Sequence, residues 1–406
     1  MALKFLDQIE LKGKKVLVRF DFNVPLKEDE NHSGDYIITD TTRIDLALPS
    51  IKYILESGAS KLIMMSHLGR PKGKPTAKYS LRPVAEYLAK NLNTEVILSS
   101  SAVDAGVKDL LNLPDTKIVL LENLRFHPEE EANNREFARK LSTLAEIYVN
   151  DAFGAAHRKH ASTYDINFFF SNKAAAGFLM KKEIEALQKI VDNPKRPFVA
   201  ILGGAKVADK IQTIERLLVM VDKMLIGGAM AYPFLAAKAI SIGKSLCSEE
   251  DLKLAKKILL QDKGNKILLP VDHIVGVDPK DNQDPGIKTS GVEISDDYMG
   301  LDIGENTCAR FTQEMNKAKT IFWNGPMGLF ENKMYEQGTK SIAQAMSKST
   351  SHAFTVVGGG DSVNAVNEFH LASEFSHVST GGGASLEFIE NGFLPGVNAL
   401  KFGVNQ

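Results

Sequence analysis

The sequence predicts an α/β fold of two doubly wound parallel-sheet domains joined by a long helix. Short apolar runs alternate with stretches long enough for a helix, which is the pattern of parallel strands linked by helical crossovers. The chain has 406 residues, enough for two domains of ordinary size. Runs in the first half end in charged residues and runs in the second half end in glycines, so we expect the two halves to bind different ligands.

The first expected strand, residues 16–20, carries Arg19 and is followed by Asp21 and Asn23. Charge in a buried strand is costly unless it is paired or functional, so these residues form either an ion pair at the strand end or part of a site. Three further strands are expected in this half, with helical crossovers over 42–58 and 81–92. These strands span 61–65, 117–121 and 146–149.

Cationic side chains follow the strands of the first half. The carboxyl ends of parallel strands meet at one edge of the sheet, where ligands bind in such folds, so these side chains should converge. Guanidinium groups match carboxylate and phosphate, which predicts a small and highly anionic ligand. The converging groups are His67, Arg70, Arg125 and Arg158, with Arg43 opening a helix nearby.

Glycine-rich turns follow the strands expected in the second half. Glycine lets the backbone approach a ligand closely, and helix N-termini offer free N–H groups to phosphates, so this half is expected to bind a nucleotide. The usual P-loop and dinucleotide-binding motifs are absent, which disfavours those two classes. The expected strands at 198–202, 224–226, 320–323 and 354–357 precede Gly203-Gly204-Ala205-Lys206, Gly227-Gly228, Asn324-Gly325-Pro326 and Gly358-Gly359-Gly360-Asp361-Ser362, and Gly381-Gly382-Gly383 opens a further helix.

Three charged residues in these turns each have two interpretations. Lys206 and Lys210 are one helical turn apart and are expected to share a face of the first helical turns. Cations there oppose the helix dipole, which favours phosphate binding over two solvated lysines. Asp361 is expected at a helix start, where it is either an N-cap or a ligand of magnesium, an ion that takes one or two carboxylates plus substrate phosphates.

The chain resembles the phosphoglycerate kinase family from about the first strand to Leu400. The resemblance implies two Rossmann-like domains with the active site in the cleft between them. It also implies reversible phosphoryl transfer from 1,3-bisphosphoglycerate to ADP, giving 3-phosphoglycerate and ATP, with Mg²⁺ as cofactor. The blocks that carry it, in family order, are Val16-Leu-Val-Arg-Phe-Asp-Phe-Asn-Val-Pro25, Ser66-His-Leu-Gly-Arg-Pro71, Glu122-Asn-Leu-Arg-Phe-His127, Gly203-Gly-Ala-Lys-Val-Ala-Asp-Lys210, Trp323-Asn-Gly-Pro326, Gly358-Gly-Gly-Asp361 and Ser379-Thr-Gly-Gly-Gly383.

The resemblance also implies roles for individual residues. Catalytic roles would fall to Arg43, Lys206, Gly359 and Gly382. In the substrate site, His67, Arg70, Arg125 and Arg158 would hold the 3-phosphate, Asp21 the 2-hydroxyl, and Asn23 with Arg43 the reacting carboxyl end. The nucleotide site would comprise Gly203, Gly204, Ala205, Lys206, Lys210, Gly227, Gly228, Leu301, Asn324, Pro326, Glu331, Gly358, Gly359, Gly360, Asp361 and Ser362, with Asp361 on magnesium.

The expected domains are 1–172, which binds 3-phosphoglycerate, and 193–390, which binds the nucleotide. A helix over 173–192 joins them, with hinges near Asn172 and Asn193-Pro194, and the tail 391–406 should return to the first domain. The chain departs from the family pattern in a longer exposed loop over 27–36. It also departs at Glu305, a position where a proline is often expected. This difference leaves the nucleotide preference open.

Composition sets the remaining expectations. A net charge of −1 gives no reason to expect nucleic acid or a membrane as partner. No apolar run approaches the ~20 residues of a spanning helix, and two cysteines are too few for a disulfide framework, so we expect a cytoplasmic monomer. A metal site at His157 and His160 is disfavoured because no further ligand completes it. Two alternatives stay open: a nucleotide-binding regulatory or scaffolding protein without turnover, and a dehydrogenase, for which we find neither a hydride-transfer base nor a ribose-binding acid.

Overall fold

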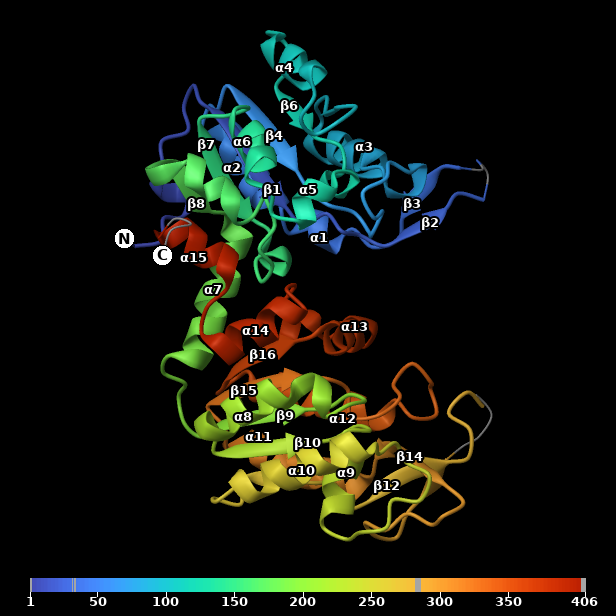
Figure 1. Cartoon of the computed structure of the whole chain (residues 1–406). Coiled ribbons are helices and arrows are strands. Elements are labelled where there is room, and N and C mark those ends of the chain that lie inside the picture. The colour runs from blue at the N-terminus through green and yellow to red at the C-terminus, as the bar shows by residue number, and fades with distance from the viewer. Residues whose placement is uncertain (1, 31, 33, 282–285, 403–406) are drawn as a thin grey trace. The chain divides into compact units, whose positions relative to one another are not determined.

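The computed structural model describes residues 2–30, 32, 34–281 and 286–402, which form two compact units. The first unit runs to Glu185 and takes up the chain again from Phe393, and the second unit is Ala186–Gly392. Each unit contains its own parallel sheet, so the predicted fold class is confirmed (Figure 1). The expected limits of the domains stay a prediction.

The first unit is built on a six-stranded parallel sheet with the strand order β5-β6-β4-β1-β7-β8. Alternate residues of β1 point to opposite faces, and Val16, Val18 and Phe20 join one hydrophobic cluster with residues of helices α2 and α3. Arg19 therefore lies on the other face. The strands are β1 (Lys15–Phe20), β4 (Lys61–Met65), β5 (Ile97–Leu98), β6 (Ile118–Leu120), β7 (Ile147–Asp151) and β8 (Ala174–Ala176).

The helices of the first unit lie between these strands in the chain, except α15, which follows the second unit. The expected crossover over 42–58 is two helices rather than one, and the crossover over 81–92 is confirmed as α3. Short 3₁₀ turns include η3 (Leu124–Phe126), which follows β6, and η6 (Ser171–Lys173). The helices are α1 (Thr42–Asp45), α2 (Leu48–Glu56), α3 (Arg82–Leu92), α4 (Ala105–Asn112), α5 (Pro128–Glu131), α6 (Arg135–Ser142) and α15 (Pro395–Phe402).

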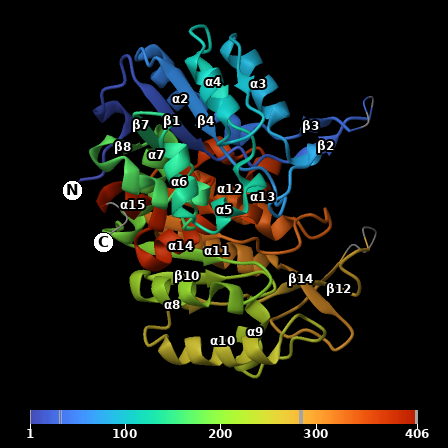
Figure 2. The same ribbon diagram turned by 45° about the horizontal axis from the view of Figure 1, so that its top comes forward.

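The segment 27–36 was expected to be an exposed loop, but only part of it is a loop. It belongs to an antiparallel hairpin of β2 (Leu26–Glu28) and β3 (Tyr36–Ile38), which projects from the first unit (Figure 2). The turn residues suggested a loop because Asp, Glu, Asn and Gly are poor strand formers. Residues 31 and 33 of this segment lie outside the described part of the chain.

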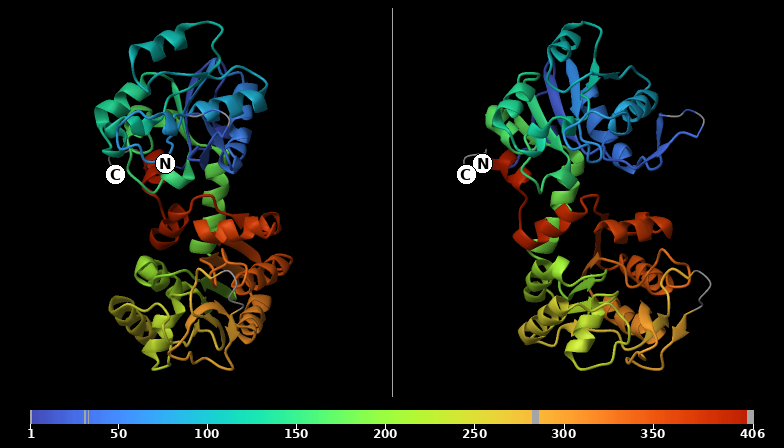
Figure 3. Two further views of the ribbon diagram at one scale, coloured as in Figure 1. Left: turned by 90° about the vertical axis from the view of Figure 1, so that its right-hand side faces the viewer. Right: turned by 45° about the vertical axis from the view of Figure 1, so that its right-hand side comes forward.

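The helix expected over 173–192 is shorter than predicted. Residues Ala174–Ala176 form β8, which pairs with β7, and helix α7 spans Phe178–Val191. Three alanines favour a helix by propensity, but here they supply an edge strand, because tertiary context overrides propensity. The hinge near Asn172 stays a prediction, and because Asn172 precedes a strand of the sheet, the bend is better expected after that strand. Helix α15 contacts β8 in the first unit. In Figure 3 it is the red helix near the label C. Residues 403–406 lie outside the described part.

The second unit has a six-stranded parallel sheet in the order β11-β10-β9-β15-β16-β17. One face packs against α11 and α12, with Trp323, Phe311 and Ile342 in a shared hydrophobic cluster. The strands are β9 (Phe198–Leu202), β10 (Lys223–Ile226), β11 (Ile267–Leu268), β15 (Thr320–Asn324), β16 (Phe354–Gly358) and β17 (His377–Val378). The helices are α8 (Ile211–Met220), α9 (Ala231–Ala237), α10 (Glu249–Gln261), α11 (Glu305–Lys317), α12 (Gln337–Ser349), α13 (Gly360–Glu368) and α14 (Gly383–Asn391).

The second unit also contains an antiparallel sheet that the sequence did not predict. Its order is β13 (Ile287–Lys288), β12 (His273–Gly276) and β14 (Met299–Ile303). This sheet places Leu301 beside the loop after β15, because the amide of Leu329 donates to the carbonyl oxygen of Leu301 at 2.8 Å. Within the described ranges, no helix combines the length and apolar character that crossing a membrane requires.

Candidate active site

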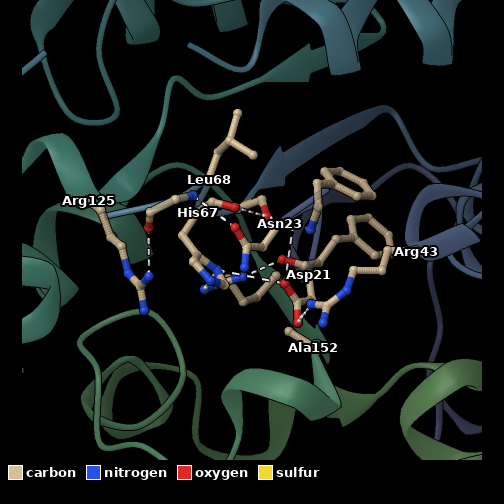
Figure 4. A network of polar contacts seen from close by, with 12 residues as sticks. Asp21, Asn23, Arg43, His67, Leu68, Arg125 and Ala152 are labelled. Carbon is tan, nitrogen blue, oxygen red and sulfur yellow. Dashed lines mark hydrogen bonds and ion pairs between the residues drawn. The ribbon is translucent and has the colours of Figure 1, made fainter. Parts of the chain in front are cut away.

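The carboxyl ends of four neighbouring strands in the first unit carry the predicted polar residues. Strand β1 lies between β4 and β7, with Arg19 opposite both Met65 and Asn150 in the registers. The residues that follow these strands therefore emerge at one edge of the sheet. Asp21, Asn23, Arg43, His67 and Arg125 meet there, and we call these five residues the anion cluster (Figure 4).

Asp21 is the centre of the anion cluster. Its Oδ2 accepts a hydrogen bond from Arg43 Nη1 at 2.6 Å, and its Oδ1 lies 3.8 Å from His67 Nδ1. Burial raises the pKa of Asp21, but the positive charges of Arg43 and Arg19 and the backbone bond from Asn23 outweigh that effect and lower the pKa to about 2. Asp21 is therefore an anion at neutral pH and orients Arg43.

His67 does not act as one of the cations that the sequence suggested. It is buried, and burial lowers the pKa of its imidazole well below 6.5, an effect that the neighbouring charges of Arg19, Arg125 and Arg43 reinforce. The nearby carboxylate of Asp21 acts in the opposite direction but does not prevail. His67 is neutral at pH 7, and the positive charge of this edge comes from arginines.

Arg125 is held by the loop that follows β4. Its Nη1 donates to the carbonyl oxygen of Gly69 at 2.8 Å, while Asn23 Oδ1 accepts from the amide of Gly69 at 2.8 Å. Arg70 and Arg158 are exposed, and Arg158 contacts its neighbour His157. Arg158 is close enough for its charge to lower the pKa of Arg125, after the larger effect of burial. For Arg70, the described structure gives no polar contact with the anion cluster.

Asn123 holds together the loops that carry His67 and Arg125, a role that the sequence reasoning missed. Its buried side-chain amide accepts from the backbone N–H groups of Leu68 and Arg125 and donates to the carbonyl oxygens of Leu68 and Tyr79. These bonds tie the loop after β4 to the loop after β6. The available signal was its position shortly after β6 and two residues before Arg125.

In the second unit, the glycine turns permit very close backbone approach. A Cβ on Gly203 would lie 2.0 Å from the carbonyl oxygen of Pro326, and one on Gly227 would lie 2.5 Å from Met327 Sδ. The amide of Gly204 donates to Pro326 at 3.0 Å, and the amide of Gly228 donates to Met327 at 3.0 Å. The turns after β9, β10 and β15 are therefore packed on one another at one edge of the sheet.

The two lysines after β9 were expected to share a helix face, but the structure shows that they do not. Helix α8 begins at Ile211, after a 3₁₀ turn over Ala208–Lys210, so both lysines precede it. Lys206 is exposed, whereas Lys210 Nζ donates to the carbonyl oxygens of Gly203 at 2.7 Å and Asn324 at 3.2 Å. Burial lowers the pKa of Lys210 to about 8, against the opposing charges of Asp361 and Asp209.

Asp361 is not the N-cap of α13. The helix begins at Gly360, its N-cap is Gly359 with a φ of 87°, and Asp361 lies exposed in the first turn. The carboxylate lies close enough for its charge to raise the pKa of Lys210. The interpretation of Asp361 as a mere cap is therefore wrong.

The last residue of β15 carries a buried amide group. Asn324 Nδ2 has no hydrogen-bond partner among the described residues, and a Cβ on Gly359 would lie 2.4 Å from it. The buried Ser362 hydroxyl accepts from the amide of Gly325. Leu301 is buried in β14, Glu331 is exposed, and Gly382 is the N-cap of α14. The Asn324 amide beside these glycine turns therefore offers an N–H donor that a bound anion would satisfy.

An arginine-rich site in one unit and a glycine-lined site in the other are typical of enzymes that transfer a phosphoryl group to or from a nucleotide. Comparison with known proteins supports this class of enzyme. The family model of phosphoglycerate kinase matches residues 6–392. A phosphoglycerate kinase of Anaeromyxobacter sp. (strain Fw109-5) is 52% identical over 406 residues, covering 99% of this chain and 100% of that protein.

Solved structures show the same similarity. Phosphoglycerate kinase from Coxiella burnetii superposes with a TM-score of 0.85 at 38% identity, covering 98% of this chain and 99% of that one. The enzyme from Pyrococcus horikoshii OT3 gives a TM-score of 0.83 at 30% identity over 99% of both chains. The chain belongs to the phosphoglycerate kinase family, a family of transferases that catalyse reversible phosphoryl transfer in glycolysis. This membership sets aside the dehydrogenase and the non-catalytic regulatory protein.

Proposed function

We propose that the anion cluster, with Arg70 and Arg158, binds 3-phosphoglycerate and 1,3-bisphosphoglycerate. The contact that carries this proposal is the Arg43–Asp21 pair, with 2.6 Å between Nη1 and Oδ2. Asp21 would accept from the 2-hydroxyl, and Asn23 and Arg43 would bind the reacting carboxyl end. His67, Arg70, Arg125 and Arg158 would hold the 3-phosphate, His67 as a neutral donor and the arginines as cations.

The glycine turns of the second unit are proposed to bind ADP and ATP. Gly203, Gly204, Ala205, Gly227, Gly228, Leu301 and Pro326 would line the adenine pocket, and Glu331 would contact the ribose. One support is the Asn324 amide, which has no hydrogen-bond partner among the described residues. The other is Lys210, whose ammonium donates to two carbonyl oxygens. A bound phosphate could replace part of the water that this ammonium has lost. Gly358, Gly359, Gly360 and Ser362 would border the phosphates at the start of α13.

Magnesium is proposed to enter with the nucleotide. The residues present fit it, because Asp361 offers exposed carboxylate oxygens beside the glycine turn, and Mg²⁺ characteristically combines one or two carboxylates with substrate phosphates and water. Bound there, the ion would neutralise phosphate charge.

The chain's own residues would work mainly by positioning and by balancing charge. In-line transfer involves little covalent chemistry for the protein, so the reacting atoms must be aligned and the charge on the moving group stabilised. Lys206 is exposed and, within the described part of the chain, has no anchoring contact of the kind that holds Lys210, so it is free to follow that group. Arg43 would neutralise the acceptor carboxyl, and Gly359 and Gly382 would direct backbone N–H groups at the transferring phosphoryl.

A coupled assay for ATP formation from ADP and 1,3-bisphosphoglycerate, with both substrates varied, tests these roles. Lys206→Ala and Arg43→Ala should lower kcat by about 10²-fold or more, as for loss of one charge stabiliser in the transition state. Arg70→Ala and Arg125→Ala should mainly raise KM for 3-phosphoglycerate in the reverse direction. The matched control is Lys253→Ala, at an exposed lysine of α10. An unchanged kcat in Lys206→Ala would remove Lys206 from the mechanism.

We further propose that the protein acts as a monomer in the cytoplasm, on small-molecule substrates and without nucleic acid or membrane partners. Support comes from the near-zero net charge, the two free cysteines Cys247 and Cys308, and the glycolytic reaction of the family. Light scattering at working concentration, which should return a mass near 44.5 kDa, tests the oligomeric state.

A further inference from the structure

Arg19 is a fully buried charge to which the roles proposed above assign no function. A guanidinium has five N–H donors and no acceptor. In β1, Nε of Arg19 donates to Ser162 Oγ at 2.9 Å, Nη1 donates to the carbonyl oxygen of Phe20, and Nη2 lies 3.1 Å from His67 Nδ1. These bonds are not the simple Arg–Asp ion pair that a charged strand end suggested.

The hydrogen bonds of Arg19 have a defined direction. Ser162 Oγ donates its single proton to Glu130 Oε1 at 2.5 Å, so its lone pair must accept the N–H of Arg19. The amide of Ser162 donates to the other oxygen of Glu130 at 3.0 Å. Glu130 is completely buried, and burial raises its pKa despite the charge of Arg19 and the bonds from Ser162. Glu130 thus fixes the position of Arg19 through Ser162.

The Nδ1 atom of His67 lies between a donor and an acceptor. Arg19 Nη2 is at hydrogen-bond distance, whereas Asp21 Oδ1 at 3.8 Å is too far for a hydrogen bond. Because arginine can only donate, Nδ1 must accept, and the single proton of the neutral ring is then on Nε2. Within the described residues, Nε2 has no hydrogen-bond partner, so its N–H is available to a ligand. The other charged groups around the ring are Arg43 and Arg125.

We propose that Arg19 is a positioning residue that keeps His67 in the neutral form protonated on Nε2, so that His67 offers an N–H donor to the anionic substrate. This inference rests on the proposed function, in which His67 contacts the 3-phosphate. Without Arg19, the carboxylate of Asp21 would attract a proton to Nδ1. A neutral ring would then present the Nε2 lone pair to an anion and repel it, and only the doubly protonated ring would bind.

Nitrogen NMR of histidine-labelled enzyme tests the tautomer without substrate, with His67→Gln used to assign the signals. The wild type should show Nε2–H and an unprotonated Nδ1 without titration from about pH 6 to 8. In Arg19→Met, His67 should move to the Nδ1–H form or titrate in that range. A wild-type His67 protonated on Nδ1, or an unchanged spectrum in Arg19→Met, would overturn the proposal.

A matched control and a second variant keep this test decisive. Tyr148→Phe removes the hydrogen bond from the Tyr148 hydroxyl to the carbonyl oxygen of Ser162, 2.7 Å long, but leaves the side-chain contacts between Glu130, Ser162 and Arg19 in place. It should keep the wild-type spectrum. Should Arg19→Met fail to fold, Ser162→Ala retains Arg19 but cuts its link to Glu130, and it should shift the His67 signals in the same direction.

Kinetics then separate this inference from the proposed function. In Arg19→Met, KM for 3-phosphoglycerate should rise with pH between about 6 and 8, by ~10-fold or more as for a lost bond to a charged group, while the wild type stays flat. An unchanged KM in His67→Gln would contradict the role proposed for His67, even if the NMR result stands. A raised KM in His67→Gln with unaltered NMR signals in Arg19→Met would contradict only the role of Arg19.

Discussion

Two lysines four positions apart differ because of their surroundings. Lys206 is exposed at the end of a glycine turn, while Lys210 is folded back onto the carbonyl oxygens of Gly203 and Asn324. Removing an ammonium from water favours its neutral form, which explains the lowered pKa of Lys210. The two lysines therefore differ in exposure and in contacts, which fits the separate roles proposed for them.

The lowered pKa of Lys210 predicts a pH dependence of nucleotide binding. With a pKa of about 8, Lys210 is a cation below that pH and loses its charge as the pH rises through it. Affinity for ADP, measured by calorimetry without magnesium, should therefore fall between pH 7.5 and 9.5 by up to about tenfold per pH unit. Lys210→Met should bind ADP weakly at pH 7 and show no such fall. A pH-independent affinity in the wild type would mean that Lys210 does not meet the phosphates.

Asp361 leads to a prediction about magnesium. Because Gly359 occupies the N-cap position of α13, Asp361→Asn should change the free energy of unfolding by only about 0.3–1 kcal/mol, the value of a charge near a helix N-terminus. It should nevertheless raise the magnesium concentration needed for half-maximal activity. Asp209→Asn, at another exposed carboxylate near Lys210, should leave that requirement unchanged. Normal activity of Asp361→Asn at limiting magnesium would exclude Asp361 as the ligand.

At the scale of elements, the start of α13 is set by one glycine. Gly359 has φ 87° and ψ 142°, which only glycine adopts readily, and its missing side chain leaves room for Asn324. Its neighbour Gly360 is the first helical residue, and a Cβ there would meet nothing within 4 Å. The helix N-terminus next to β16 therefore depends on the first of these glycines and not on the second.

Alanine at each of these two glycines tests that difference. Gly359→Ala should lower the free energy of unfolding by about 1–3 kcal/mol, because the backbone would be strained and the Cβ would displace Asn324. Gly360→Ala should leave the free energy of unfolding within about 1 kcal/mol of the wild type, since alanine favours the helix. Denaturant unfolding of both variants, with ADP affinity as a second readout, measures the difference. Equal effects of the two substitutions would contradict this account of the helix start.

At the scale of the whole molecule, the two proposed sites belong to separate compact units that share helix α7. In-line transfer needs reacting atoms about 3–3.5 Å apart, and an acyl phosphate must be kept from water. We therefore expect hinge bending at the ends of α7, with Asn193-Pro194 at one end and Gly177, between β8 and Phe178, at the other. Each ligand binds mainly one unit, so only both together should strongly favour the closed state.

Small-angle X-ray scattering tests this closure. The pair 3-phosphoglycerate and ADP cannot react, so all four states, free, singly liganded with each and doubly liganded, can be measured at equilibrium. The radius of gyration should fall most in the doubly liganded protein. The same radius in every state, in a preparation with full activity, would mean that catalysis needs no closure.

The parallel core was the most predictable part of the fold. The limits of β4 and β9 agree with the sequence expectation, because both are buried runs of apolar residues that end at polar or glycine residues. The small antiparallel sheet was missed, since β13 has two residues and is exposed and therefore leaves no hydrophobic pattern. Strand β8 was taken for helix because alanine carries no strand signal.

In the site, the residue types and their order along the chain were sufficient to predict an anion site, a glycine-lined site and the family. Strand ends and glycine turns can be recognised from local sequence. The tertiary structure alone decided that His67 is neutral, that Lys210 is anchored while Lys206 is not, and that Asp361 is not a cap. It also revealed Asn123 and the contacts of Arg19 with Ser162 and His67. Charge state and hydrogen-bond partner depend on burial and on groups distant in sequence, and only the folded chain brings these together.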